Sequence, residues 1–162
     1  MRNPADFALL PTKFAEAGVR LVHIDAFPAS KIDGASFKME GTPVIGISGR
    51  GQRLDKVLFT ILHECAHVAL GHTEHGPIID IDSPHGKERE DQANETAANW
   101  ALNTPLPPLP DRITQSWLTH VAQQASVHPV VVVGRLQHDR KLSWRSALVK
   151  DAPNVTEFLQ AW

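Results

Sequence analysis

The sequence predicts an α+β fold in which a small three-stranded sheet is followed by helices. Three short segments between residues 19 and 48 have strand patterns and are separated by turn residues. Residues 54–70 then form a long apolar segment without Gly or Pro, and residues 87–102 form a second long segment rich in Ala and Glu. Both long segments predict helices. The 162 residues suit one domain, which we divide into residues 1–53, 54–104 and 105–162.

The first part, residues 1–53, is predicted to hold a helix and the sheet. A helix is expected over residues 5–17, because Phe7, Leu10 and Phe14 recur at helical spacing and Gly18 is a stop signal. Pro11 is unfavourable within the early part of this helix. Strands are expected at residues 19–24, which Pro28 closes, and at 35–39 and 43–48, with a turn at 40–42.

The last part, residues 105–162, is predicted to be helical. A proline-rich connector at residues 105–110 follows the second long helix, and Asp111 is expected to cap a helix that runs to about Ala125. Pro129 suits the first turn of a helix that runs to about His138. A short amphipathic helix is expected over residues 154–162.

The composition excludes several classes of protein. The formal net charge is -2 and the pI is near 6.5, so we expect no direct nucleic-acid partner and no binding to anionic membranes. The sequence has neither a signal-peptide core nor about 18 consecutive apolar residues. Cys65 is the single cysteine, which excludes an internal disulfide. We therefore expect a cytoplasmic protein, whose oligomeric state the sequence does not indicate.

Residues 63–67 read His-Glu-Cys-Ala-His, an H-E-x-x-H motif on the most strongly predicted helix. His63 and His67 are four residues apart and share a helix face, so both can bind one Zn²⁺ ion. Glu64 lies beside them and can act as a general base toward water activated by the metal. No Lys or Arg occurs from Val57 to Gly86, which favours a buried helix whose polar groups need partners. An exposed amphipathic helix is the alternative.

The residues alone do not decide which side chain is the third metal ligand. The H-E-x-x-H-x-x-G-x-x-H pattern fails, because Leu70 and Thr73 occupy the positions of its Gly and last His. Two E-x-x-A-N segments on the next helix offer Glu90 or Glu95, with Asn94 or Asn99 as a hydrogen-bond partner for a ligating histidine. Weaker candidates lie in the loop expected at residues 72–86, namely His72, His75, Asp80, Asp82 and His85.

Several segments resemble the ImmA/IrrE metallopeptidase family. They are residues 18–22, 34–37, 43–48, 58–67 (L-F-T-I-L-H-E-C-A-H), 90–99 and 131–139, so the resemblance spans about residues 14–148. It implies a minimal zincin-like domain, in which the sheet packs on the buried H-E-x-x-H helix and further helices follow. It favours Glu90 over Glu95 as the third zinc ligand. It also implies a protein substrate, a helix-turn-helix DNA-binding repressor whose cleavage relieves transcription.

Peptide hydrolysis by zinc also needs a donor to the developing oxyanion. The chain has no tyrosine, and Arg135 and His138, three residues apart in the family-like segment, are the preferred candidates. His72 is a weaker one. Alternatively, Arg135 pairs with a surface carboxylate and His138 caps a helix end.

Two classes of function therefore remain in competition. The first is an active endopeptidase that cuts a regulator protein. The second is a catalytically silent metal-binding module that binds a partner in a toxin-antitoxin or phage-type regulator; the presence of Glu64 argues against it, because a structural zinc site needs no general base. Direct DNA binding through residues 125–138 is a weaker third reading, since the chain is acidic overall.

Overall fold

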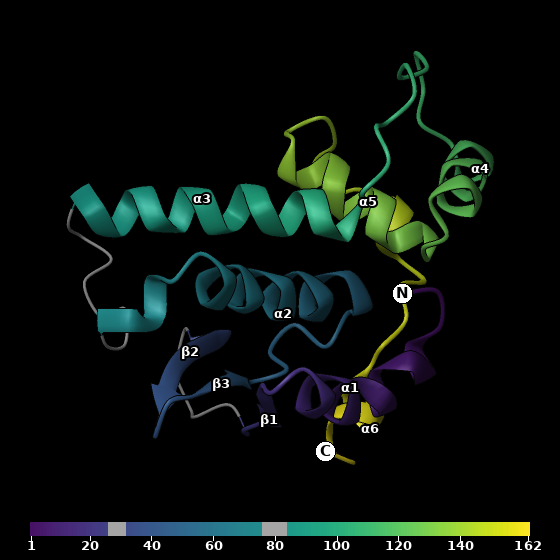
Figure 1. Cartoon of the computed structure of the whole chain (residues 1–162). Coiled ribbons are helices and arrows are strands. Elements are labelled where there is room, and N and C mark those ends of the chain that lie inside the picture. The colour runs from purple at the N-terminus through teal and green to yellow at the C-terminus, as the bar shows by residue number, and fades with distance from the viewer. Residues whose placement is uncertain (26–31, 76–83) are drawn as a thin grey trace.

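The computed structural model describes residues 1–25, 32–75 and 84–162 and has the α+β architecture that the sequence predicts. A helix of 16 residues, α2 (Leu54–Ala69), lies between the sheet and the long helix α3 (Pro84–Ala101) (Figure 1). Most of the circumference of α2 is apolar, as expected for a helix that is covered on two sides. Among the described residues, no helix is long and apolar enough to span a membrane.

The sheet contains β1 (Arg20–His23), β2 (Gly34–Met39) and β3 (Thr42–Ile47) in the order β1-β3-β2. β3 is parallel to β1 and antiparallel to β2, with which it forms a hairpin. The turn uses Glu40 and Gly41, both with positive φ (50° and 83°), the conformation that suits the twist of a two-residue hairpin. All three predicted strands are confirmed, whereas Pro28 lies outside the described residues. β2 is left at one edge of the sheet, and α2 packs against it.

The N-terminal helix differs from the prediction. A 3-10 helix, η1 (Pro4–Leu9), comes first, and α1 (Leu10–Glu16) follows it with Pro11 in its first turn. Proline is tolerated there because the first N–H groups of a helix have no intrahelical partner, whereas inside a helix over residues 5–17 it would remove a hydrogen bond.

Two hydrophobic clusters form the core. The first packs the sheet, the N-terminal residues and the C-terminal segment against α2, and includes Phe7, Ile45, Leu54, Ile61 and Leu159. The second packs α4 (Gln115–Ala125) against α5 (Pro129–His138). Helix α5 joins the clusters, because its consecutive valines at 130–133 contribute two residues to each.

The helix boundaries after residue 70 require three corrections. α4 begins at Gln115 rather than after Asp111, because the Thr114 hydroxyl caps it by accepting from the Trp117 N–H, while Asp111 lies in an exposed bend. The last helix, α6, covers only Thr156–Leu159. The segment predicted as a loop at 72–86 contains a 3-10 turn, η2 (His72–His75), and the first residues of α3; residues 76–83 are not described. A further 3-10 turn, η3 (Ala147–Val149), lies between α5 and α6.

Residues near the end of the chain close the first cluster. The Leu54 N–H donates to the Pro153 carbonyl (2.9 Å), and the Val155 N–H donates to the Gln52 carbonyl (2.9 Å). The Trp162 indole N–H reaches the Phe7 carbonyl at 3.0 Å. The start of α2 is therefore held by backbone from the C-terminal segment.

Candidate metal centre

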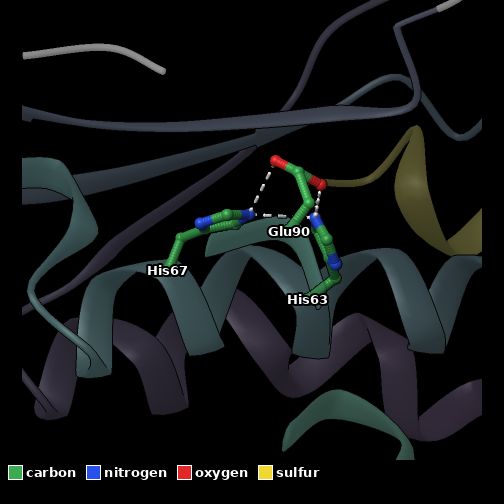
Figure 2. Close-up of side chains that lie close together, drawn as sticks. All are labelled: His63, His67 and Glu90. Carbon is green, nitrogen blue, oxygen red and sulfur yellow. Dashed lines mark hydrogen bonds and ion pairs between the residues drawn. The ribbon is translucent and has the colours of Figure 1, made fainter. Parts of the chain in front are cut away.

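Three side chains from two helices converge beside the sheet. α2 presents His63 and His67, and α3 presents Glu90 toward them (Figure 2). The Nε2 atoms of the two histidines are 3.0 Å apart. One carboxylate oxygen of Glu90 is 3.2 Å from the His63 Nε2, and the other is 3.3 Å from the His67 Nε2. This geometry is consistent with the sequence prediction that His63, His67 and Glu90 bind one metal ion.

The spacing of these atoms fits a tetrahedral zinc ion. Zinc bonds of about 2.0–2.2 Å at the tetrahedral angle separate neighbouring ligand atoms by roughly 3.3–3.6 Å. The three measured separations, 3.0, 3.2 and 3.3 Å, are close to that range. Two imidazoles and one carboxylate are also a ligand set that zinc uses in catalytic sites, where it leaves the fourth position open.

Burial favours the neutral form of both histidines, which is the form that binds a metal. His67 is 2% exposed, and burial, reinforced by His63, His72 and Arg89, lowers its pKa to about 4. Burial also lowers the pKa of His63, although the neighbouring Glu90 carboxylate opposes the shift. Because a protonated imidazole cannot ligate, these shifts favour metal binding over proton binding.

His67 is held by a second histidine that the sequence reading did not recognise as its partner. The His67 Nδ1 is 3.0 Å from the His72 Nδ1, and the His72 Nε2 is 3.2 Å from the Gln92 Oε1. With the His67 Nε2 facing the cluster, its Nδ1–H donates to His72, whose Nε2–H donates to Gln92. Gly71 reverses the chain at the end of α2 with φ of 73°, which returns His72 to the motif helix.

His63 has fewer supporting hydrogen bonds than His67. Its Nδ1 is buried and has no hydrogen-bond partner among the described residues. Asn94, four residues after Glu90 on α3, interacts with His63 and, like Glu90, opposes the lowering of its pKa by burial. Glu95 and Asn99, the alternatives from the second E-x-x-A-N segment, are exposed on α3. The structure therefore brings only the first segment to the cluster.

Glu64 lies beside the cluster in a buried position. It is 7% exposed, and burial raises its pKa to about 7, with a hydrogen bond from Ser36 opposing the shift and Glu90 reinforcing it. Gly34 on β2 makes room for it, because a Cβ at residue 34 would lie 2.9 Å from the Glu64 Oε1 and 2.8 Å from the Thr60 Cγ2. β2 therefore limits the positions that the Glu64 carboxylate can take.

The two predicted oxyanion donors lie on α5 and already have partners. Arg135 donates to both carboxylate oxygens of Asp139 (3.0 and 2.9 Å) and to the Ala98 carbonyl (2.9 Å). The His138 Nδ1 is 3.2 Å from an Asp139 oxygen, and its ring packs on Phe59 with centroids 5.6 Å apart. These contacts match the alternative reading of Arg135 as a residue paired with a carboxylate. The oxyanion role stays a prediction.

Comparison with known proteins supports a metallopeptidase-type function. The family model Peptidase_M78, described as the IrrE N-terminal-like domain, matches residues 14–137. This range includes the sheet, α2, α3 and all three cluster residues. No curated protein matches the chain.

Proposed function

Because the chain belongs to the Peptidase_M78 family, with its IrrE N-terminal-like domain, we propose that it is a zinc-dependent endopeptidase. In this proposal His63, His67 and Glu90 hold the metal and Glu64 is the general base. The observation that carries it is the convergence of the three ligand atoms from α2 and α3 at 3.0–3.3 Å.

Zinc, when bound, supplies a Lewis acid that polarises the peptide carbonyl and makes water a stronger acid. The chain supplies the proton acceptor. The Glu64 carboxylate takes a proton from the attacking water and then passes it to the nitrogen of the leaving amine. Burial against β2 keeps this carboxylate in one place and limits its contact with bulk water.

His72 and Gln92 have a positioning role in this proposal. They hold the His67 ring in one orientation and one tautomer, with its Nε2 free to ligate. A ligand held in this way loses less freedom on binding the metal, so its affinity for the metal is higher.

We extend the proposal to the substrate by family resemblance. The substrate is a protein, a helix-turn-helix DNA-binding repressor, whose cleavage would give the enzyme a part in transcription regulation in the cytoplasm.

The first test of this function is the metal content of the purified protein. After loading with zinc and dialysis, elemental analysis should find about one zinc per wild-type chain. The zinc should be lost in Glu90→Ala and kept in Glu95→Ala, a matched control on an exposed face of the same helix. Absence of zinc from the wild type would contradict the proposal.

The second test separates the enzyme from a silent binding module. The zinc-loaded protein is incubated with a peptide library made from a digested proteome, and new termini are identified by mass spectrometry. Cleavage should occur with the wild type and disappear in Glu64→Gln, which should retain its zinc. Zinc binding without cleavage by either protein, together with a stable complex with a repressor, would favour the silent module.

A further inference from the structure

A pocket of about 400 Å³ lies between α2, α3 and α5, and its α2 wall is formed by residues that precede the H-E-x-x-H motif. We propose that this pocket receives a large apolar side chain of the protein substrate, on a residue next to the cleaved bond. The proposal rests on the proposed function and adds a specificity determinant to it. Its walls include apolar groups of Phe59, Thr60, Ala101, Val131 and Trp144.

Two wall residues of the pocket lie close to Glu64 and to the cluster residue His63. Thr60 lines the pocket, and its methyl group and the Glu64 carboxylate both lie within 2.9 Å of the point where a Cβ on Gly34 would be. Phe59 also lines the pocket, and its ring centroid is 6.3 Å from that of the ligand His63. A chain whose peptide bond lies between Glu64 and the metal can therefore place a neighbouring side chain in the pocket.

Arg135 and Asp55, which line the pocket, are already paired, and this favours an uncharged occupant. Arg135 is bound by the Asp139 carboxylate at 2.9 Å. The buried Asp55 is bound by Arg53, which donates from two nitrogens at 2.7 and 2.6 Å.

Arg50 and Lys56 also line the pocket, and both are exposed. Arg50 lies 3.8 Å from an Asp33 carboxylate oxygen. Lys56 is exposed, so its ammonium group can stay in water when the pocket fills. A cationic side chain would therefore lose its water without gaining a strong new partner, and an anionic one would meet only the exposed Lys56, an ion pair that water weakens.

The size of the pocket favours a large side chain. Ligand pockets commonly measure about 300–1,000 Å³, and this one is at the lower end. A methyl group would leave most of the apolar wall uncovered, whereas a benzyl group would cover more of it. One methylene in such a pocket changes discrimination by about 10- to 200-fold, so a benzyl side chain should be preferred over a methyl by at least about 10-fold.

The test measures binding and needs no substrate. Three hydroxamic acids, identical except for a methyl, benzyl or carboxymethyl side chain next to the metal-binding group, are titrated into the zinc-loaded protein by calorimetry. The methyl compound reports on the metal centre alone. We expect the benzyl compound to bind at least about 10-fold tighter than the methyl compound and the carboxymethyl compound to show no such gain.

Two variants locate the benzyl group. Ala101→Leu places a larger side chain in the pocket, and Trp144→Ala removes one apolar wall. Both should reduce the ratio of benzyl to methyl affinity several-fold. Trp100→Ala is the matched control, because Trp100 is 47% exposed on α3 and does not line the pocket, and it should keep the wild-type ratio. Trp144 is 61% exposed, so its removal keeps the test valid even if Ala101→Leu fails to fold.

Three outcomes would overturn the inference. Equal binding of the methyl and benzyl compounds would refute the pocket while leaving the metal centre intact. The tightest binding by the carboxymethyl compound would refute its apolar character. No binding of any hydroxamate to the zinc-loaded protein would refute the proposed function together with the pocket.

Discussion

His72 should control metal affinity although it does not belong to the cluster of proposed ligands. Its Nδ1 lies 3.0 Å from the His67 Nδ1, and the pair lies in a buried part of the structure. His72→Ala leaves the His67 Nδ1–H without this acceptor. The ring of His67 can then rotate or change tautomer, and both changes withdraw its Nε2 from the cluster.

The size of the effect follows from what is lost. The hydrogen bond itself contributes about 0.5–1.5 kcal/mol, and a buried donor left unsatisfied costs about 1–3 kcal/mol. Removal of such outer partners of zinc ligands typically weakens binding by about 10- to 100-fold, which corresponds to about 1.4–2.7 kcal/mol. We therefore expect a zinc affinity about 10- to 100-fold lower in His72→Ala.

Competition with a fluorescent zinc chelator at pH 7 measures this affinity directly. Gln92→Ala should cause a smaller loss, because Gln92 is exposed and water can replace its oxygen. His120→Ala, which removes an exposed histidine on α4, should match the wild type. An unchanged zinc affinity in His72→Ala, with the metal-free protein folded in both cases, would refute the positioning role.

Three further predictions concern the carboxylates and the histidines. Gly34→Ala should lower peptide cleavage at least about 10-fold with zinc retained, because the new Cβ would displace Glu64. The substitution should also lower the free energy of unfolding by about 1–3 kcal/mol, measured by urea unfolding. Unchanged cleavage would contradict the role of β2. Asp55→Ala should lower the free energy of unfolding by about 2–4 kcal/mol, because it leaves Arg53 without its bidentate partner. A loss below about 1 kcal/mol in the same urea assay would refute the stabilising role of this ion pair. The metal-free protein should lose stability as pH falls from 6.5 toward about 4, because an unfolded histidine binds a proton near pH 6.5 whereas folded His67 does so only near 4. The slope should be at most about 1.4 kcal/mol per pH unit for that histidine and smaller in His67→Ala, and an equal slope in both would contradict the lowered pKa.

The motif helix could be predicted because its information is local. Residues 54–70 contain no Gly or Pro, and the structure ends α2 at Ala69, one residue before the predicted end. The common face of His63 and His67 follows from helical periodicity alone. The strands were predictable for the same reason, since turn residues separate three short apolar segments.

The choice of the third cluster residue depended on tertiary packing. Glu90 and Glu95 are five residues apart, so on an α-helix they point about 140° away from each other, and only one of them can face α2. Which one does so depends on how α3 rotates against α2, and periodicity within α3 does not determine this. The structure turns Glu90 inward and leaves Glu95 exposed.

The start of α4 shows a different limit of prediction from the sequence. Asp111 and Thr114 are both good capping residues, and the local pattern does not distinguish between them. The pairing of His72 with His67 was also hidden, because it requires the chain reversal at Gly71. In both cases the outcome depends on backbone geometry between neighbouring elements.

The attachment of residues 153–162 to the start of α2 sets an order of events during synthesis. The backbone partners of Gln52 and Leu54 are Val155 and Pro153, about 100 residues later in the chain. At about 5–20 residues per second, a ribosome needs roughly 5–20 s to make that interval. During this time the motif helix has left the ribosome while Leu54 and Ile61 still lack Leu159, their neighbour in the core. The nascent chain should therefore be most vulnerable to aggregation and to cellular proteases in the seconds before residues 153–162 emerge.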